Sequence, residues 1–107
     1  MRIGAALIEL SVPEADSIKA RRRVARSLVD RLRHRFNASV AELGDPDDRH
    51  SVCIGCVMLG RDPRHLRTAL ERVVRYVEDL GLAEVVADDV TLVQLDELTE
   101  IEPDAQG

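Results

Sequence analysis

The sequence predicts an α+β fold in which two helices cover one face of a four-stranded antiparallel sheet. Four apolar segments have the length of strands, and two longer segments repeat apolar residues at helical spacing. Together they follow the order β-α-β-β-α-β. Right-handed crossovers and one hairpin convert that order into the ferredoxin-like arrangement, with the first and third strands in the middle of the sheet. A chain of 107 residues suits one such domain, which we expect over residues 1–95.

The first half of the chain supplies three elements. Residues 2–12 are almost entirely apolar, as expected for a central strand covered on both faces. Asp16 or Ser17 is expected to cap the first helix, because their side-chain oxygens accept hydrogen bonds from free backbone amides. That helix extends to about Phe36, and residues 38–43 are predicted to form a short strand.

The middle of the chain is predicted to form a hairpin and a second helix. Residues 44–48, GDPDD, have the composition of a turn, and residues 50–59 form a strongly apolar strand. Asp62 followed by Pro63 predicts the start of the second helix, since proline is tolerated at the first helical position. Gly81 is a typical terminator and ends that helix.

The C-terminal segment is predicted to contain the last strand and a tail. The strand covers residues 85–95, with a bulge at Asp88 and Asp89, where the alternation of apolar and polar residues slips. Residues 96–107, DELTEIEPDAQG, are predicted to be a mobile acidic tail.

Apolar side chains occur on both faces of the first predicted strand. Ile8 and Leu10 fall on one face, whereas Ile3 and Leu7 fall on the other. Because two helices cover only one face of a sheet, we expect the second face to be buried in a homodimer or against another partner.

The two cysteines form a C-x-x-C motif, a pattern that occurs in redox pairs and zinc sites. Cys53 and Cys56 lie within a predicted strand, where residues three apart point to opposite faces. We therefore interpret them as small buried residues and expect neither metal binding nor an intrachain disulfide.

Other candidate sites are weaker still. The acidic cluster that begins at Asp45 lacks the glycine and the glutamate of a calcium loop, so we interpret it as a solvated turn. His34, His50 and His65 are scattered over different elements, and no glycine-rich phosphate-binding motif is present. The sequence predicts no catalytic residue, no metal site and no cofactor, and hence a non-enzymatic binding protein.

Charge is distributed very unevenly. Residues 17–36 contain eight Lys and Arg residues against Asp30 alone, a net charge of +7, whereas the whole chain carries −5. At about 100° per residue, five of these cations project opposite the apolar face of the helix. We call them the basic stripe, and they are Lys19, Arg22, Arg23, Arg26 and Arg33.

Three interpretations of the basic stripe follow from the sequence. It binds an external polyanion such as RNA, it pairs with the acidic residues of 84–107, or it is an ordinary solvated helix face. In the second helix, by contrast, basic and acidic residues balance over residues 62–80. Pairs such as Arg67–Glu71 and Arg75–Asp79 are spaced to neutralise each other.

Any RNA would contact the helix rather than the sheet. Phe36 and Tyr76 are the only aromatic residues, and the predicted central strands have none. The base-stacking platform of an RRM-type sheet is therefore missing. Binding through helical Lys and Arg residues to phosphates is expected to read shape rather than sequence.

The segment SIKARRRVARSLVDRLRHRFNASVAELGD, residues 17–45, resembles the signature of the YlxP-like family, small bacterial proteins of unknown function. The family pattern S-L-K-x-K-R falls on residues 17–22, S-L on residues 27–28, and R-F-N-V-S-V-A-E-V-G-D on residues 35–45. Arg21 stands where the family pattern has lysine.

The resemblance spans about residues 2–95. It implies a ferredoxin-like fold and a bacterial cytosolic protein. Because family members are often encoded beside translation and ribosome-maturation factors, it also implies association with RNA or the ribosome. The absence of an apolar run near the roughly 20 residues of a membrane span, and of a signal peptide, agrees with a cytoplasmic protein without membrane contact. The alternative function is a homodimeric protein-interaction or small-ligand regulatory domain.

Overall fold

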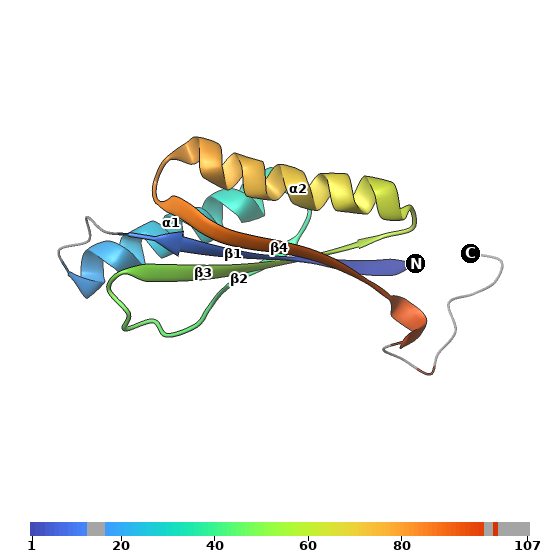
Figure 1. Cartoon of the computed structure of the whole chain (residues 1–107), viewed down its shortest axis with the longest axis horizontal. Helices are drawn as coiled ribbons and strands as arrows, with labels where there is room; N and C mark the ends of the chain where they lie inside the picture. The colour runs from blue at the N-terminus through green and yellow to red at the C-terminus, as the bar shows by residue number, and fades with distance from the viewer. Residues whose placement is uncertain (13–16, 98–99, 101–107) are drawn as a thin grey trace.

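The computed structural model describes residues 1–12, 17–97 and 100, and it has the predicted architecture (Figure 1). The four strands form one antiparallel sheet in the order β2-β3-β1-β4, and both helices lie on the same face of it. The elements are β1 (Arg2–Ser11), α1 (Ile18–Arg35), β2 (Ser39–Leu43), β3 (Ser51–Gly60), α2 (Pro63–Leu80), β4 (Glu84–Gln94) and the 3-10 turn η1 (Leu95–Glu97). The ferredoxin-like prediction is confirmed, with β1 and β3 at the centre.

Both helices begin and end at residues that the sequence marks for this purpose. Ser17 is the N-cap of α1, and its hydroxyl accepts a hydrogen bond from the backbone N–H three residues later at 3.2 Å. The alternative cap, Asp16, lies outside the described residues. Asp62 caps α2 ahead of Pro63, and Gly81 ends it with a φ of 66°, in the left-handed region that favours glycine. The predicted helix boundaries are confirmed.

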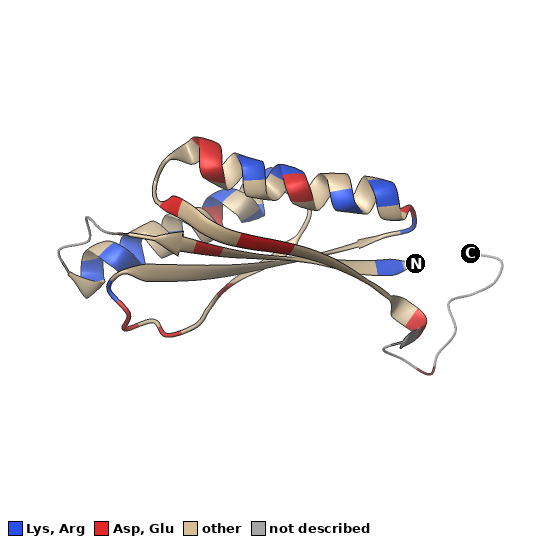
Figure 2. Cartoon of the chain, in the orientation of Figure 1, with Lys and Arg blue, Asp and Glu red and all other residues tan. Residues whose placement is uncertain are grey.

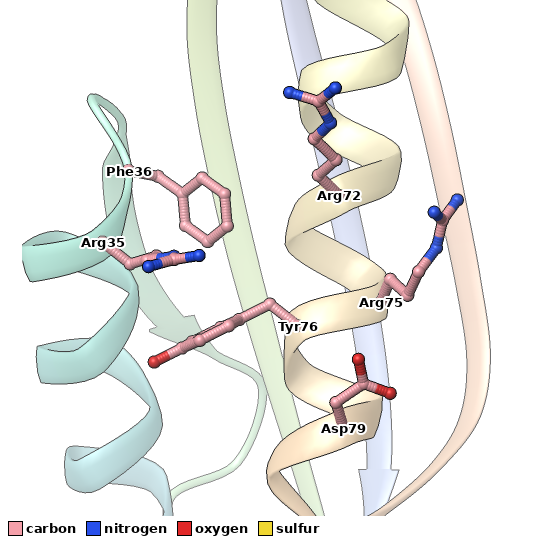
Figure 3. A pocket seen from close by; sticks show the side chains of 6 residues that line it. All are labelled: Arg35, Phe36, Arg72, Arg75, Tyr76 and Asp79. Carbon is pink, nitrogen blue, oxygen red and sulfur yellow. The ribbon is translucent and has the colours of Figure 1, made fainter.

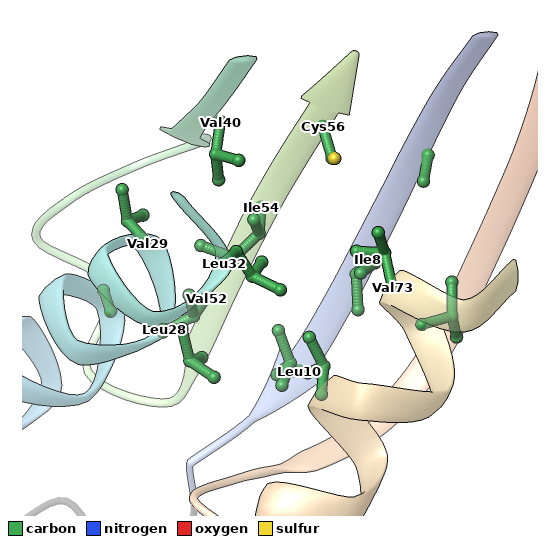
Figure 4. Packing of buried hydrophobic residues seen from close by; sticks show 14 of the residues in the cluster. Ile8, Leu10, Leu28, Val29, Leu32, Val40, Val52, Ile54, Cys56 and Val73 are labelled. Atoms are coloured by element: carbon green, nitrogen blue, oxygen red, sulfur yellow. The ribbon is translucent and has the colours of Figure 1, made fainter. Parts of the chain in front are cut away.

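The core lies between the sheet and the two helices (Figure 4). Gly4 of β1 allows α2 to approach closely, because a Cβ atom there would lie 2.5 Å from Cδ1 of Leu70. The fully buried side chains that join the layers are Ile8 and Leu10 of β1, Leu28 and Leu32 of α1, Val52 and Ile54 of β3, and Leu70, Val73 and Val77 of α2. The inner faces of both helices are therefore fixed by packing.

The bulge in β4 lies earlier than predicted. The pairing of β4 with β1 shifts between Glu9 and Leu10, which leaves Val86 as the extra residue. The prediction of a bulge at Asp88 and Asp89 was wrong, because both residues pair regularly with β1. The side chain of Asp88 is exposed even though its register places it on the helix side, since β4 is an edge strand.

The face of the sheet opposite the helices, here called the open face, is largely apolar. Four of its large side chains, Leu7, Leu43, Val57 and Leu59, are between 41% and 63% exposed. Leu43 folds over Gly55 of the neighbouring strand, where a Cβ atom would lie 2.8 Å from its Cδ1 atom. No described helix covers this face (Figure 1).

The cysteines lie on opposite faces of β3, as predicted. Cys56 is part of the core, as expected, whereas Cys53 belongs to the open face and is partly exposed, so the prediction that both are buried was wrong for Cys53. Burial raises the pKa of both thiols, and the nearby Glu9 carboxylate adds to the effect on the pKa of Cys53.

The described part of the C-terminal segment stays near the start of β1. The backbone N–H of Leu95 donates to the carbonyl of Met1 at 3.1 Å, which places η1 at that end of the sheet. Most of the predicted acidic tail, residues 98–99 and 101–107, lies outside the described residues. Neither α1 nor α2 has an apolar stretch long enough to cross a membrane.

Candidate nucleic-acid interface

The structure brings four of the five residues of the basic stripe together. Lys19, Arg22, Arg23 and Arg26 are exposed on the N-terminal half of α1 and, with Ile18, line a depression of about 550 Å³. Their positions follow from the helix period, because residues three and four apart occupy one face. Figure 2 shows this concentration of Lys and Arg at one end of the molecule. An extended anion can contact several of these side chains at once.

Arg33 lies apart from the other four. It is exposed, but its Nη2 group donates a hydrogen bond to the backbone carbonyl of Val40 in β2 at 2.7 Å. The side chain therefore leans toward the sheet edge, about two turns beyond the depression. The sequence correctly assigns Arg33 to the exposed side of α1, but it does not reveal this contact.

Arg21, the neighbour of the stripe, is buried and structural. Its side chain is 1% exposed, and its guanidinium forms an ion pair with Glu42 of β2. Its Nε donates to the carbonyl of Ser51 at 3.0 Å, and its Nη2 donates to the carbonyl of Asp45 at 3.4 Å. One arginine thus ties α1 to both ends of the β2–β3 connection. Its guanidinium is not available to an external ligand.

The β2–β3 connection is an acidic turn that closes on itself, as predicted. Asp45 accepts from the N–H of Asp47 at 2.9 Å, and Asp48 accepts from the N–H of His50 at 2.8 Å and the hydroxyl of Ser51 at 2.6 Å. The bond from Ser51 lowers the pKa of Asp48, with a smaller contribution from the amide of His50. Among the described residues, no three His, Cys, Asp or Glu side chains are arranged to hold a metal ion.

The same turn neutralises part of α1. The carboxylate of Asp47 lies 3.1 Å from Nη2 of Arg22, in an ion pair that is exposed to solvent. Within residues 1–12, 17–97 and 100, the ion pairs of α1 are this one and the pair between Arg21 and Glu42. The remaining basic side chains of the helix, Lys19, Arg23, Arg26, Arg31, Arg33 and Arg35, have no acidic partner among those residues.

The sequence suggested a different source of neutralisation, the acidic residues of 84–107. The described acidic side chains in that range, including those of β4, form no ion pair with α1. For Asp96 of η1 the position explains this result, because η1 and the N-terminal half of α1 lie toward opposite ends of the molecule (Figure 1). The hairpin contacts were not foreseen, since they join residues more than 20 positions apart.

The second helix also differs from expectation. The predicted pairs Arg67–Glu71 and Arg75–Asp79 are not formed in α2, which is described over its whole length. Arg67 instead lies 3.5 Å from the carbonyl of Val90, to which its Nη1 donates. Arg72 and Arg75 line the groove between the helices, and Figure 3 shows that the Arg75 side chain extends away from α1. Basic and acidic residues are equal in number over residues 62–80, but they do not neutralise each other through Arg–Glu or Arg–Asp ion pairs within α2.

Between the C-terminal halves of α1 and α2 lies a groove that was not predicted from the sequence. This inter-helix groove has a volume of about 220 Å³ and is lined by Arg35, Phe36, Arg72, Arg75, Tyr76 and Asp79 (Figure 3). The rings of Phe36 and Tyr76 meet edge to face, with centroids 5.6 Å apart. The guanidinium of Arg35 lies 5.7 Å from the centre of the Tyr76 ring. The sequence held one signal for this groove, because each of its only two aromatic residues directly follows an arginine. Phe36 follows Arg35, and Tyr76 follows Arg75.

Comparison with known proteins places the chain in a family. A family model described as "Protein of unknown function (DUF503)" matches residues 3–90. The chain belongs to this family. It is also similar to the "Uncharacterized protein YlxP" of Bacillus subtilis (strain 168), with 26% identity over 76 residues, which cover 71% of this chain and 83% of that protein. The resemblance inferred from residues 17–45 is confirmed, and the DUF503 description assigns no activity.

Proposed function

We propose that this member of the DUF503 family is a non-enzymatic RNA-binding protein of the bacterial cytoplasm, which contacts RNA phosphates through the basic stripe of α1. The observation that carries the proposal is the convergence of Lys19, Arg22, Arg23 and Arg26 on one depression. Only Arg22 among these four has an acidic partner within the described residues. Arg33 adds a fifth contact, because its guanidinium has further N–H groups beyond the one that Val40 accepts.

The charge of the whole protein supports a local rather than a diffuse interaction. With a net charge of −5, the molecule as a whole repels RNA, so association depends on the one surface where positive charge is concentrated. Arginine and lysine bound to phosphates release counterions, which makes the affinity fall steeply with salt. Phosphate contacts carry little sequence information, so we expect weak preference among RNA sequences.

The test is a titration of RNA at several salt concentrations with the wild type and a variant in which Lys19, Arg22, Arg23, Arg26 and Arg33 are replaced by Gln. For about five phosphate contacts to a single strand, the logarithm of the association constant is expected to fall by roughly 3.5 per tenfold increase in salt. The variant should lose most of this dependence. Co-sedimentation with ribosomal particles at low and high salt asks whether ribosomal RNA is the target. Equal affinity of the two proteins, both folded, would overturn the proposal.

The open face favours a second, compatible function, which is self-association with another copy of the chain. In the register of the sheet, Leu7 lies beside Gly55, Ala5 beside Val57, and Ile3 beside Leu59, so an unbroken apolar surface crosses the two central strands. Three strands roughly 33 Å long and a fourth about half as long, spaced about 4.8 Å apart, present a face of about 550 Å² in projection. This flat projection is smaller than the accessible surface of the same face, and a standard interface buries roughly 800 Å² per partner.

A second copy is the occupant that fits this face best. Its charged residues are both acidic: Glu9 lies near the end of β1, and Asp89 lies beside Leu7 on the edge strand β4, so the apolar surface of β1 and β3 can pack against itself. Sheets that pack in this way lie about 10 Å apart. In such a dimer both α1 helices stay on the outside, and two RNA-binding surfaces become available.

Val57→Glu tests self-association, because it places a charge at the centre of the open face. Thr68→Glu, on the exposed side of α2, is the matched control. Light scattering should show a dimer for the wild type and the control, and a monomer for Val57→Glu. Alkylation of Cys53, mapped by peptide analysis, should slow as the protein concentration rises. A wild type that stays monomeric at high concentration would refute this second function.

A further inference from the structure

We infer that the inter-helix groove holds an unpaired nucleobase of the bound RNA, stacked on Tyr76, with Arg35 and Arg72 on the adjoining phosphates. This inference rests on the proposed RNA-binding function and extends it from phosphate contact to base contact. The groove contains both aromatic residues of the chain and three arginines. The combination of an aromatic platform and basic side chains is what proteins use to bind single-stranded nucleic acid.

The Tyr76 ring is already occupied by a planar group. The guanidinium of Arg35 lies 5.7 Å from the ring centre, and Tyr76 is only partly buried. A cation–π contact of this kind at an exposed site is weaker than base stacking on an aromatic ring. A base can therefore take the place of the guanidinium, and Arg35, at the end of α1, is free to turn toward a phosphate.

The arginines of the groove are available for phosphate. Arg72 and Arg75 form no ion pair within the described residues, although acidic side chains lie on the same helix. Asp79 is the one acidic residue in the lining, against three arginines. The net positive charge of the groove therefore favours an anion, although the charges of α2 as a whole balance.

A second depression borders the groove, and both are lined by Tyr76 and Arg35. That depression has a volume of about 300 Å³ and is also lined by Asp30, Arg31 and His34 of α1. Both volumes lie at or below the lower end of the roughly 300–1,000 Å³ typical of small-molecule sites, which suits a single base rather than a larger ligand.

The basic stripe and the groove lie toward opposite ends of α1. An RNA strand that reaches both must also cross the exposed side of the helix, because 16 residues at about 100° each place Lys19 and Arg35 roughly 160° apart around its axis. Lys19 and Arg35 are 16 residues apart, which corresponds to about 24 Å along the helix axis. A single strand of about ten nucleotides is within the range of site sizes known for single-strand binding and can reach both ends. Phosphate contacts at the N-terminal half of α1 then position a base at the groove.

The experiment compares oligouridylate of about ten nucleotides with an abasic strand of the same length and with uridine monophosphate. Because Tyr76 is the only tyrosine, its ring resonances in the NMR spectrum report on this site alone. The wild type should bind oligouridylate about tenfold more tightly than the abasic strand, with a shift of the Tyr76 ring signals. Tyr76→Leu should abolish that difference, and Tyr76→Phe, which keeps the ring, should retain it.

Arg72→Gln should weaken the binding of both strands, whereas Arg64→Gln, on α2 outside the groove, should not. Equal affinity for oligouridylate and the abasic strand would overturn the base site and leave the phosphate surface intact. Failure of both strands to bind would overturn the proposed function together with this inference. Tight binding of uridine monophosphate alone would overturn the RNA assignment in favour of a free nucleotide. Preserved thermal unfolding of Tyr76→Phe and Tyr76→Leu guards against a mere loss of fold.

Discussion

The two helices are alike in architecture and unlike in charge. Each has 18 residues, begins at a side-chain N-cap and buries five residues against the same face of the sheet. Yet α1 contains eight basic residues and one acidic residue, whereas the charges of α2 with its cap balance. Packing dictates only the inner face of a helix. The charge excess of α1 is therefore not a requirement of the fold, and it is the basis of the RNA-binding function that we propose.

The comparison also shows that the excess is smaller than the sequence suggests. Arg21 is part of the core, and Arg22 is paired with Asp47. The hairpin thus supplies two carboxylates to α1, while no equivalent loop faces α2 within the described residues. What remains is an exposed set of cations at the N-terminal half of α1, where the fold gives them no described acidic partner.

The largest effect that sharpens this comparison is expected from Arg21→Ala. The change leaves the carboxylate of Glu42 and the carbonyls of Ser51 and Asp45 without their donor, so the free energy of unfolding should fall by about 3 kcal/mol. This is the lower end for a broken buried pair, because the Glu42 side chain is 30% exposed. Urea denaturation measures the loss.

Arg64→Ala is the matched change on α2. The residue is exposed, so we expect a change within about 0.5 kcal/mol. Arg21→Lys should recover part of the lost stability. Lysine keeps the positive charge beside Glu42, but it cannot reproduce all three contacts that the guanidinium makes. If Arg21→Ala and Arg64→Ala lower the free energy of unfolding equally, Arg21 has no greater structural role than an exposed arginine.

Asp47→Asn is expected to have an intermediate effect, on binding rather than on stability. It frees Arg22 from its ion pair and removes one negative charge beside the basic stripe. An interaction of about 1 kcal/mol between charges near 4 Å in water corresponds to roughly fivefold tighter RNA binding at low salt. Stability should change little, since exposed pairs contribute about 0–1 kcal/mol.

Fluorescence anisotropy with labelled RNA measures the affinity. Glu71→Gln, which removes the same charge from an exposed position of α2 outside both the stripe's depression and the inter-helix groove, provides the control for net charge. If both variants tighten binding equally, Asp47 has no specific relation to α1.

Some of the features compared above could be predicted from the sequence alone. The six main elements, the cap residues Ser17 and Asp62, and the terminator Gly81 are local signals, and each was predicted. The opposite directions of Cys53 and Cys56 follow from the two-residue period of a strand. Periodicity is sufficient for such features because they depend on neighbours in the sequence.

Features that depend on distant neighbours were not predictable in this way. A helical projection assigns Arg21 to the inner side of α1, but it does not show that Glu42 and the turn carbonyls lie there to receive it. The bulge at Val86 depends on the register with β1. The inter-helix groove depends on how far apart two helices sit on the sheet, which no local pattern encodes.

The smallest expected effect is a pH dependence of the β2–β3 connection. The bonds from Ser51 and His50 lower the pKa of Asp48, so its folded state holds the carboxylate more strongly than the unfolded chain does. That contribution is present above the ordinary pKa of 3.8 and is lost as the pH falls through the lower folded value. We expect the NMR signals of residues 44–51 that follow the titration of Asp48 to change only as the pH falls below 3.8, because a lowered pKa delays protonation of this carboxylate. A midpoint at or above 3.8 for these signals would contradict the role given to the hydrogen bonds from Ser51 and His50.

The most direct test of the central claim compares the salt dependence of RNA binding for two charge-matched variants. One carries Lys19→Gln, Arg23→Gln and Arg26→Gln on α1, and the other carries Arg61→Gln, Arg64→Gln and Arg67→Gln at the start of α2. Each loses three positive charges, so their net charges are identical. The α1 variant should reduce the slope of log K against log salt by about two units for single-stranded RNA, and the α2 variant should leave it unchanged. Equal slopes for the two variants would contradict the assignment of the RNA surface to α1.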